Sequence, residues 1–200
     1  MKLYFANTSP YARKARIALR ELSLLPKVEE VFQNPFEDSP ALVASNPLKK
    51  VPCLITGEGQ AIYDSPVICA YLSARSESKT LHPDGAARWP TLTGEALADG
   101  ILDAAFALVM ERRRPEEQRS DNWQARWQAS IDRSVTALDS DLQAFYGEIT
   151  IAQVALGAAL GYLDFRLPDI EWRAGRNELA DWFKAFAARP SMQDTQPPAS

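Results

Sequence analysis

Two short motifs, Val51-Pro52 and Asp64-Ser65, combine residue types that suit the binding of a small peptide-like molecule. A proline that enters a strand gives no N–H to the sheet, so the backbone of Val51 is expected at a sheet end, where it can pair with a ligand. Asp64 and Ser65 are expected at the start of a helix, where free N–H groups attract a carboxylate. With the lysines that precede Val51, these groups predict a site for a small zwitterion.

A hydroxyl group near the N-terminus is the candidate for chemistry. Ser9 directly precedes Pro10, which is expected to open the first helix. A serine in this position either caps the helix or donates a hydrogen bond to a ligand, and the sequence leaves both roles open. Thr8 and Tyr11 are competing hydroxyl donors.

The elements that must position these residues alternate between strand and helix in the first part of the chain. Periodicity and turn signals predict a strand over 2–5, a helix from Pro10, a strand over 28–32 and a short helix from Pro40. A strand starting at Pro52, a turn over 57–59, a short strand and a helix capped at Asp64 or Ser65 follow. This order predicts an α/β domain over 1–76.

The rest of the chain is expected to be all-helical, as a second domain over 86–200 after a linker over 77–85. A long amphipathic helix should end near Arg112, and a second should close at Gly147. The apolar stretch 150–163 predicts a helix surrounded by neighbours, with Thr150 and Gln153 as a capping box. An aromatic helix over 179–186 precedes a proline-rich tail that we expect to be loose.

Composition excludes several classes of function. A net charge of −4 argues against a nucleic-acid-binding protein. The chain shows neither a signal peptide nor an apolar stretch of membrane-spanning length, so we expect a cytoplasmic protein. No cluster of histidine, cysteine or carboxylate residues has metal-ligand spacing. The two cysteines, Cys53 and Cys69, fit a reducing compartment without a disulfide.

The order and spacing of these motifs resemble a known family. Ser9-Pro10-Tyr11, Val51-Pro52 and Asp64-Ser65, with Arg189-Pro190-Ser191 near the end, are similar to the soluble bacterial glutathione transferases. The resemblance implies a thioredoxin-like α/β domain followed by an all-α helical bundle. It also implies a cytoplasmic homodimer that acts in detoxification, with glutathione as co-substrate, no metal, and no nucleic-acid or membrane partner.

The resemblance assigns the glutathione-binding residues. A cis bond before Pro52 would turn the Val51 backbone outward to pair with the cysteinyl unit, although an ordinary trans proline is the commoner case. Ser65 would receive the γ-glutamyl carboxylate, with Asp64 near the ammonium group, and both residues would also serve as helix caps. Lys50 would meet the glycyl carboxylate, unless it is a solvated loop lysine.

The resemblance also assigns Ser9 as the residue that activates the thiol. A free thiol has a pKa of about 8.5, so an enzyme that uses glutathione as a nucleophile must stabilise the thiolate. A serine only donates a hydrogen bond, which favours nucleophilic transfer over thiol-disulfide exchange. The resulting hypothesis is a glutathione transferase that attacks a small electrophile. The alternatives are a glutathione-dependent isomerase, lyase or reductase, and a regulatory or scaffold protein without activity.

A second-substrate pocket would lie between the two domains. Its expected lining is Tyr11, Phe106, Met110 and Arg113, although helical spacing makes Phe106 and Met110 equally suitable as core residues.

Several other positions carry expectations of their own. Lys49 stands where the family often has glycine, and Gln153 where it usually has aspartate. The basic residues of the first helix are expected mostly on a solvated face: Arg13, Lys14, Arg16 and Arg20.

Overall fold

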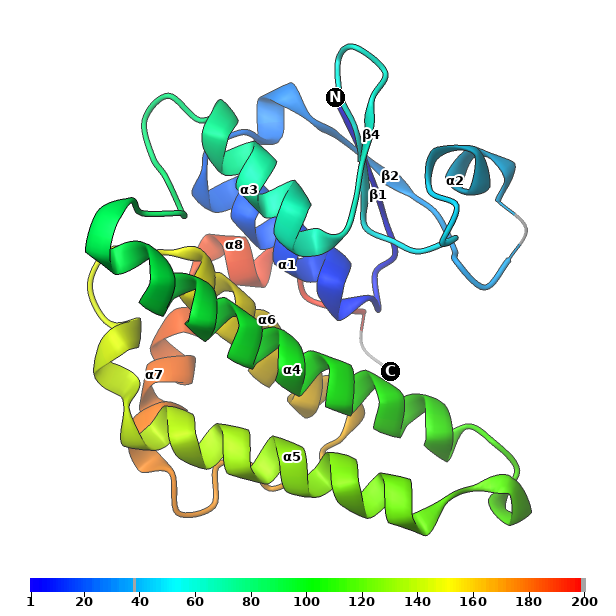
Figure 1. The fold of residues 1–200 in the computed structure, drawn as a ribbon, viewed down its shortest axis with the longest axis vertical. Coiled ribbons are helices and arrows are strands. Elements are labelled where there is room, and N and C mark those ends of the chain that lie inside the picture. Colours follow the sequence, from blue (N-terminus) through cyan, green and yellow to red (C-terminus); the bar gives the residue numbers. More distant parts are fainter. Residues whose placement is uncertain (38, 199–200) are drawn as a thin grey trace. The chain divides into compact units, whose positions relative to one another are not determined.

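The computed structural model describes residues 1–37 and 39–198 and divides into two compact units, whose elements are labelled in Figure 1. The first unit comprises Met1–Gly85 together with the segment that starts at Pro190, and the second is Ala86–Arg189. The sequence prediction assigned residues 190–200 to the helical domain. The division differs there because this segment packs against a helix of the first unit.

The first unit is built on a four-stranded mixed sheet with the order β2-β1-β3-β4. β1 (Lys2–Phe5) is parallel to β2 (Glu29–Phe32) and antiparallel to β3 (Cys53–Ile55). β4 (Ala61–Ile62) completes the sheet as an antiparallel neighbour of β3. All four strands lie in the predicted segments, and β3 begins one residue later than predicted because Pro52 stays outside the ladder.

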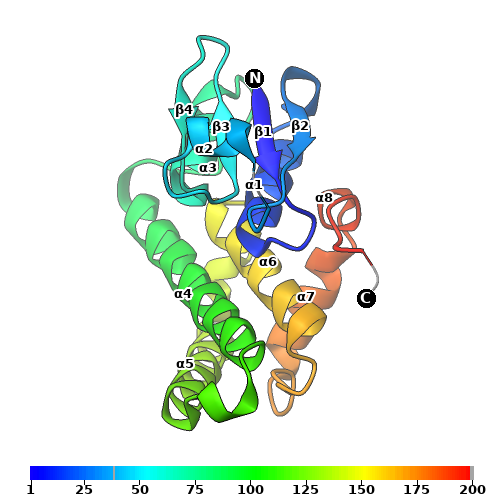
Figure 2. The same ribbon diagram turned by 90° about the vertical axis from the view of Figure 1, so that its right-hand side faces the viewer.

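Helices cover both faces of this sheet. Figure 2 shows α2 (Pro40–Ser45) in front of the sheet, with α1 (Pro10–Glu21) and α3 (Ser65–Arg75) behind it. α1 and α3 pack against each other. The apolar residues Ala12, Ala15 and Leu19 recur along α1 at helical spacing and are fully inaccessible to solvent. The predicted α/β organisation of this unit is therefore what the structure has.

The expectation of a solvated basic face on α1 is wrong. Lys14 is fully buried, and Arg13 and Arg16 are less than a tenth exposed. Arg16 and Arg20 converge on Glu30 of β2, with Arg16 Nε donating to Glu30 Oε1 at 2.6 Å and Arg20 Nη2 to Glu30 Oε2 at 2.8 Å. Burial raises the pKa of Glu30, but the hydrogen bonds from Arg20 and Arg16 together lower it by more than burial raises it. The pKa of Glu30 is therefore below its ordinary value.

The C-terminal segment also differs from its prediction. Instead of a loose tail, it forms the short helix α8 (Pro190–Gln193), in which Met192 is 1% exposed. Arg13 Nη2 of α1 donates to the Met192 carbonyl at 3.2 Å, and Ser191 Oγ donates to Glu21 Oε1 at 2.5 Å. Hydrogen bonds made by buried polar groups thus fix this segment to α1.

The second unit contains four α-helices among its described residues: α4 (Arg88–Arg112), α5 (Asp121–Ser140), α6 (Ile151–Arg166) and α7 (Asn177–Ala187). Every residue from Ile151 to Leu163 is buried, which confirms the prediction of a central helix. α6 packs against α4 and α7, and α5 packs against α4.

The start of α6 and the end of α5 can be compared with the predictions made from local sequence signals. Thr150 N–H donates to Gln153 Oε1 at 2.6 Å, and Gln153 Nε2 donates to the Glu148 carbonyl at 2.9 Å, so glutamine closes the predicted capping box. The second long helix ends at Ser140 rather than near Gly147, and a 3₁₀ turn follows over Leu142–Phe145. Residues three apart share one side of a 3₁₀ turn, so the apolar spacing there fits it as well as an α-helix.

Shorter 3₁₀ segments complete the described secondary structure: Leu25–Lys27, Gly85–Ala87 and Glu116–Gln118.

Candidate functional site

The strand register brings the predicted binding residues to one end of the sheet. Tyr4 near the end of β1 pairs with Cys53 at the start of β3, and Ile62 at the end of β4 pairs with Leu54. Because both neighbours run antiparallel to β3, their C-terminal ends lie beside its N-terminal end. The chain leaves β1 towards Ser9, enters β3 from Val51, and leaves β4 towards Asp64.

The Val51 backbone has polar groups available at this end of the sheet. The Val51 residue is 7% exposed and belongs to a small buried cluster with Leu42 and Cys53. Within the described residues, neither its N–H nor its C=O makes a hydrogen bond. The peptide bond between Val51 and Pro52 is cis. Since buried backbone groups are nearly always paired, this donor and acceptor suit an extended peptide ligand.

Asn46 shapes the loop that leads to Val51. This residue is 1% exposed, and its Nδ2 donates to the Lys50 carbonyl at 2.9 Å while its Oδ1 accepts from Leu48 N–H at 3.0 Å. Sequence reasoning did not single out Asn46, although asparagine before proline is a turn signal that could have indicated it. Lys50 itself is exposed at the end of this loop.

Lys49 adopts a left-handed backbone conformation, with φ +52°. Glycine tolerates this conformation because it lacks Cβ. This conformation explains physically why glycine is expected here from the family resemblance. Lys49 keeps the same turn at a cost in backbone strain.

The N-terminus of α3 carries the second predicted motif. Asp64 is the N-cap by backbone position, and its carbonyl accepts from Ile68 N–H at 3.0 Å. Its exposed side chain makes no capping hydrogen bond. Ser65 is 2% exposed, and among the described residues its hydroxyl has no hydrogen-bond partner. A carboxylate and a hydroxyl therefore remain available beside the positive end of the helix dipole.

Ser9 is the N-cap of α1. Its Oγ accepts from Ala12 N–H at 3.2 Å, and its carbonyl accepts from Arg13 N–H at 3.0 Å. The hydroxyl hydrogen has no acceptor among the residues that the structure describes. A hydroxyl group both accepts and donates, so the capping role leaves the Ser9 O–H able to donate to a ligand. The competing hydroxyls differ in setting, since Thr8 is exposed and Tyr11 is half-buried in the first turn of α1.

The cysteine nearest this site is not a reactive thiol. Cys53 is completely buried, and desolvation raises the pKa of its thiol to about 11. A protonated, inaccessible sulfur is neither a nucleophile nor a partner for disulfide exchange at neutral pH.

Of the residues predicted for a second-substrate pocket, Tyr11 belongs to the first unit, Phe106 and Met110 lie on α4 of the second, and Arg113 is the C-cap residue of α4. Phe106 is 36% exposed, Met110 is half-buried, and Arg113 is exposed with its Nη1 at 3.8 Å from Met110 Sδ. Helical spacing puts these three residues on one face of α4. The exposure of Phe106 excludes the core role that the sequence left open for it.

Neither a metal-binding cluster nor a membrane-spanning helix is found in the described part of the chain. No group of three or more histidine, cysteine or acidic residues is arranged to hold a metal ion there. None of its helices combines the length and apolarity that crossing a bilayer requires.

Comparison with known sequences identifies the family. A profile described as "Glutathione S-transferase, N-terminal domain" matches residues 3–80, and one described as "Glutathione S-transferase, C-terminal domain" matches residues 121–185. The chain belongs to the glutathione S-transferase family. Among its relatives, the chain is 33% identical over 202 residues to the uncharacterised GST-like protein YibF of Escherichia coli (strain K12), with 99% of each chain covered.

Solved structures agree with this assignment. A glutathione transferase family member from Pseudomonas fluorescens Pf-5, crystallised with bound glutathione, has 38% identity and a TM-score of 0.95, with 99% of each chain covered. A glutathione S-transferase from Methylobacillus flagellatus KT with glutathione bound has 35% identity and a TM-score of 0.93, covering 98% of this chain and 99% of its own. The predicted family and fold class of the chain are thus confirmed.

Proposed function

We propose that this protein binds glutathione at the end of its sheet and transfers it to a small electrophile. The observation that carries the proposal is the Ser9 hydroxyl, which caps α1 through its oxygen and keeps its hydrogen for donation. The P. fluorescens relative with bound glutathione supports the choice of ligand.

The proposed binding mode uses the polar groups left available at the site. The N–H and C=O of Val51 pair with the cysteinyl unit of glutathione as an added strand. The Ser65 hydroxyl and the α3 N-terminus receive the γ-glutamyl carboxylate, while the Asp64 carboxylate faces the ammonium group. Lys50, exposed beside Val51, meets the glycyl carboxylate.

The proposed chemistry is a nucleophilic displacement or addition. The Ser9 O–H donates to the glutathione sulfur and favours its thiolate form, with the proton passing to solvent. The sulfur electron pair then forms a carbon–sulfur bond with the electrophile, and the leaving group departs with its bonding pair. Lowering the thiol pKa by one unit requires about 1.4 kcal/mol, which a hydroxyl donor and a helix N-terminus supply together.

The character of the sulfur-handling residues favours transfer over reduction. A glutathione-dependent reductase of the disulfide-exchange type needs a reactive protein thiol, whereas the candidate residue is a serine and Cys53 is buried with a raised pKa. Isomerase and lyase reactions would use the same thiolate. The unpartnered Ser65 hydroxyl disfavours a pure scaffold, which has no use for it.

The proposal includes the protein's wider setting. We infer a cytoplasmic homodimer in a detoxifying role. The electrophile would be held in the second unit by the helix face that Phe106 and Met110 of α4 form with the C-cap residue Arg113. An apolar ring, a thioether and a cation on one helix face suit an aromatic electrophile that carries a polar or anionic substituent.

Calorimetric titration with reduced glutathione tests the proposal most directly. Saturable one-site binding is expected for the natural protein, and Ser65→Ala should weaken it by about tenfold through loss of a charge-assisted hydrogen bond. Ser45→Ala is the matched control, because Ser45 Oγ donates to the Ala41 carbonyl on the α2 helix of the same unit. Absence of binding at millimolar glutathione, or equal affinity in both variants, would overturn the proposal.

A further inference from the structure

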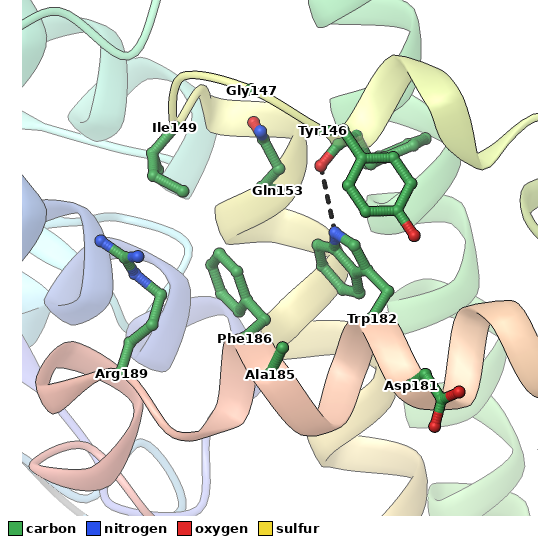
Figure 3. Close-up of a pocket in the computed structure, with 10 residues that line it drawn as sticks. Tyr146, Gly147, Ile149, Gln153, Asp181, Trp182, Ala185, Phe186 and Arg189 are labelled. Carbon is green, nitrogen blue, oxygen red and sulfur yellow. Dashed lines mark hydrogen bonds between the residues drawn. The ribbon is translucent and has the colours of Figure 1, made fainter.

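Tyr162 of α6 is a buried residue with an unused hydrogen-bond donor. It is 5% exposed, and its hydroxyl makes no hydrogen bond with the residues that the structure describes, although its oxygen is not closed off from solvent. Two buried indoles of the same unit differ. Trp172 Nε1 donates to Asp164 Oδ1 at 2.8 Å, and Trp182 Nε1 donates to a backbone carbonyl at 3.0 Å, the dashed line in Figure 3. Because buried polar groups are nearly always paired, the Tyr162 hydroxyl suits a ligand.

Two arginines near Tyr162 form no ion pair within the described part of the chain. Arg166 follows Tyr162 by one helical turn on α6, and Arg113 is the C-cap residue of α4. The guanidinium of Arg166 lies 4.0 Å from the Phe165 ring centroid, and Arg113 Nη1 lies 3.8 Å from Met110 Sδ. Neither contact neutralises the positive charge.

The acidic residues closest to Arg166 in the chain are already paired with other cations. Asp164 accepts from Arg173 at 2.5 and 2.7 Å. Asp169 accepts from Arg112 at 2.9 and 2.8 Å. These bidentate pairs leave the charge of Arg166 available to an external anion.

The pair of Arg112 with Asp169 also brings the two unpaired arginines to one end of the second unit. It joins the residue before Arg113 to the residue three positions after Arg166. Figures 1 and 2 show α4 and α6 running in the same direction. Burial raises the pKa of the Tyr162 hydroxyl, and the charges of Arg166 and Arg113 oppose this rise only in part. The hydroxyl is therefore a protonated donor at neutral pH, close to two cations.

We propose that Tyr162, Arg113 and Arg166 form a carboxylate-binding subsite for the second substrate. The phenol donates to one carboxylate oxygen, and the planar donors of a guanidinium bind the other. Phe106 and Met110, two turns and one turn before Arg113 on α4, offer apolar surface to the rest of the molecule. The inference rests on the proposed function in calling the ligand a substrate, and it narrows the electrophile to one that carries a carboxylate.

The binding test uses two unreactive probes: dinitrobenzoate with both nitro groups meta to the carboxylate, and the corresponding amide. In calorimetric titrations of the full chain without glutathione, the acid should bind at one site about tenfold more tightly than the amide, because only the acid forms charge-assisted hydrogen bonds. Arg113→Gln should reduce this ratio about threefold. Arg133→Gln is the matched control, since Arg133 is an exposed arginine on α5 of the same unit and has no ion pair among the described residues.

Tyr162→Phe separates recognition from structure. The hydroxyl has no partner among the described residues, so its removal should leave the free energy of unfolding unchanged. The ratio of acid to amide affinity should nevertheless fall about threefold. A loss of stability with unchanged selectivity would overturn the proposal, because it would show that the hydroxyl is structural.

Turnover with glutathione tests whether the bound acid is a substrate. In the derivatives with chlorine para to the carboxyl or amide group, the sulfur forms a bond to the ring carbon and chloride leaves with its bonding pair. After division by the uncatalysed rate constant, which corrects for the different reactivity of the two rings, kcat/KM should favour the acid about tenfold. Arg113→Gln should reduce this preference, and Arg133→Gln should keep it.

The outcomes distinguish this inference from the proposed function. Selective binding of the acid by a protein that binds no glutathione would support the subsite and overturn the proposed function. Equal binding of acid and amide by a protein that binds glutathione would overturn the subsite alone. Displacement of the acid by saturating glutathione, or equal loss of selectivity in Arg113→Gln and Arg133→Gln, would also overturn the subsite.

Discussion

The hydroxyl oxygen of Ser9 accepts a hydrogen bond from the backbone N–H of Ala12 at 3.2 Å. The Ser9 side chain thus pairs with one of the free N–H groups in the first turn of α1. Its hydroxyl hydrogen is still available for donation beside the end of the sheet. Ser9 can therefore cap the helix and donate to the glutathione sulfur at the same time. A substitution should affect both the stability of the protein and the pKa of the bound thiol, and each can be measured separately.

Replacing Ser9 with alanine should raise the pKa of the bound glutathione thiol by about one unit, since the donor to the thiolate is lost. Loss of the cap should also lower the free energy of unfolding by about 1 kcal/mol. Ultraviolet absorbance of the thiolate against pH gives the first quantity, and chemical denaturation gives the second.

Ser120→Ala is the control for this substitution, because Ser120 Oγ caps α5 by accepting from Trp123 N–H. It should cost similar stability and leave the thiol pKa unchanged. An unchanged thiol pKa in Ser9→Ala would transfer the activating role to Thr8 or Tyr11.

The left-handed conformation of Lys49 leads to a stabilising substitution. Lys49→Gly should raise the free energy of unfolding by about 0.5–1 kcal/mol, because relief of strain exceeds the entropy that glycine adds to the unfolded chain. Ser23→Gly, at φ +57°, should behave similarly in denaturation. Only Lys49→Gly adjoins the proposed site, so a change in glutathione affinity confined to it would show that this side chain takes part in binding.

The cluster of Glu30 with Arg16 and Arg20 should make the free energy of unfolding decrease at acidic pH. Because the folded pKa of Glu30 is lowered by Arg20 and Arg16 against the opposing effect of burial, its contribution is complete above the ordinary carboxyl pKa. It is lost as the pH falls through the folded pKa. Glu30→Gln should cost about 3 kcal/mol at neutral pH and flatten this acid dependence in denaturation curves.

The adjacent residue provides the comparison for Glu30. Glu29 pairs with Lys2 at 3.8 Å, but both side chains are more than half exposed. Glu29→Gln should therefore change stability by no more than about 0.5 kcal/mol. Equal effects at both positions would contradict the view that the buried ion cluster stabilises the first unit.

Cys53 should contribute to a decrease in the free energy of unfolding at alkaline pH. Desolvation raises the pKa of its thiol from about 9 to about 11, so its contribution to stability is complete below the unfolded pKa and lost as the pH rises through this window. Stability of the natural protein should fall more steeply there than that of Cys53→Ala. An aromatic disulfide reagent should label the Cys53 thiol only after unfolding, and fast labelling of the native protein would contradict its burial.

Local sequence signals were sufficient where each residue's environment depends on its neighbours in the chain. The uniform apolarity of 151–163 predicted the buried helix α6, and proline with a preceding serine predicted the start of α1. The positions of Val51 just before a strand and of Asp64 and Ser65 at a helix start were predictable for the same reason, because strand starts and helix caps have short-range signatures.

Long-range pairing explains what the sequence did not reveal. Arg16 and Arg20 look solvated until Glu30 of β2 is known to lie beside them, and the tail looks loose until Met192 is known to dock on α1. The edge-to-face contact of Phe145 with Trp182 likewise joins two residues on different elements. Periodicity within one helix carries no information about such partners.

The docking of α8 on α1 makes the first unit discontinuous in the chain. During synthesis its sheet and helices emerge first, but Arg13 and Glu21 meet their partners on α8 only after the whole helical unit has been made. N-terminal domains generally fold first on the ribosome. Here that order has a limit, because a nascent chain halted before Pro190 holds a first unit that still lacks its last helix.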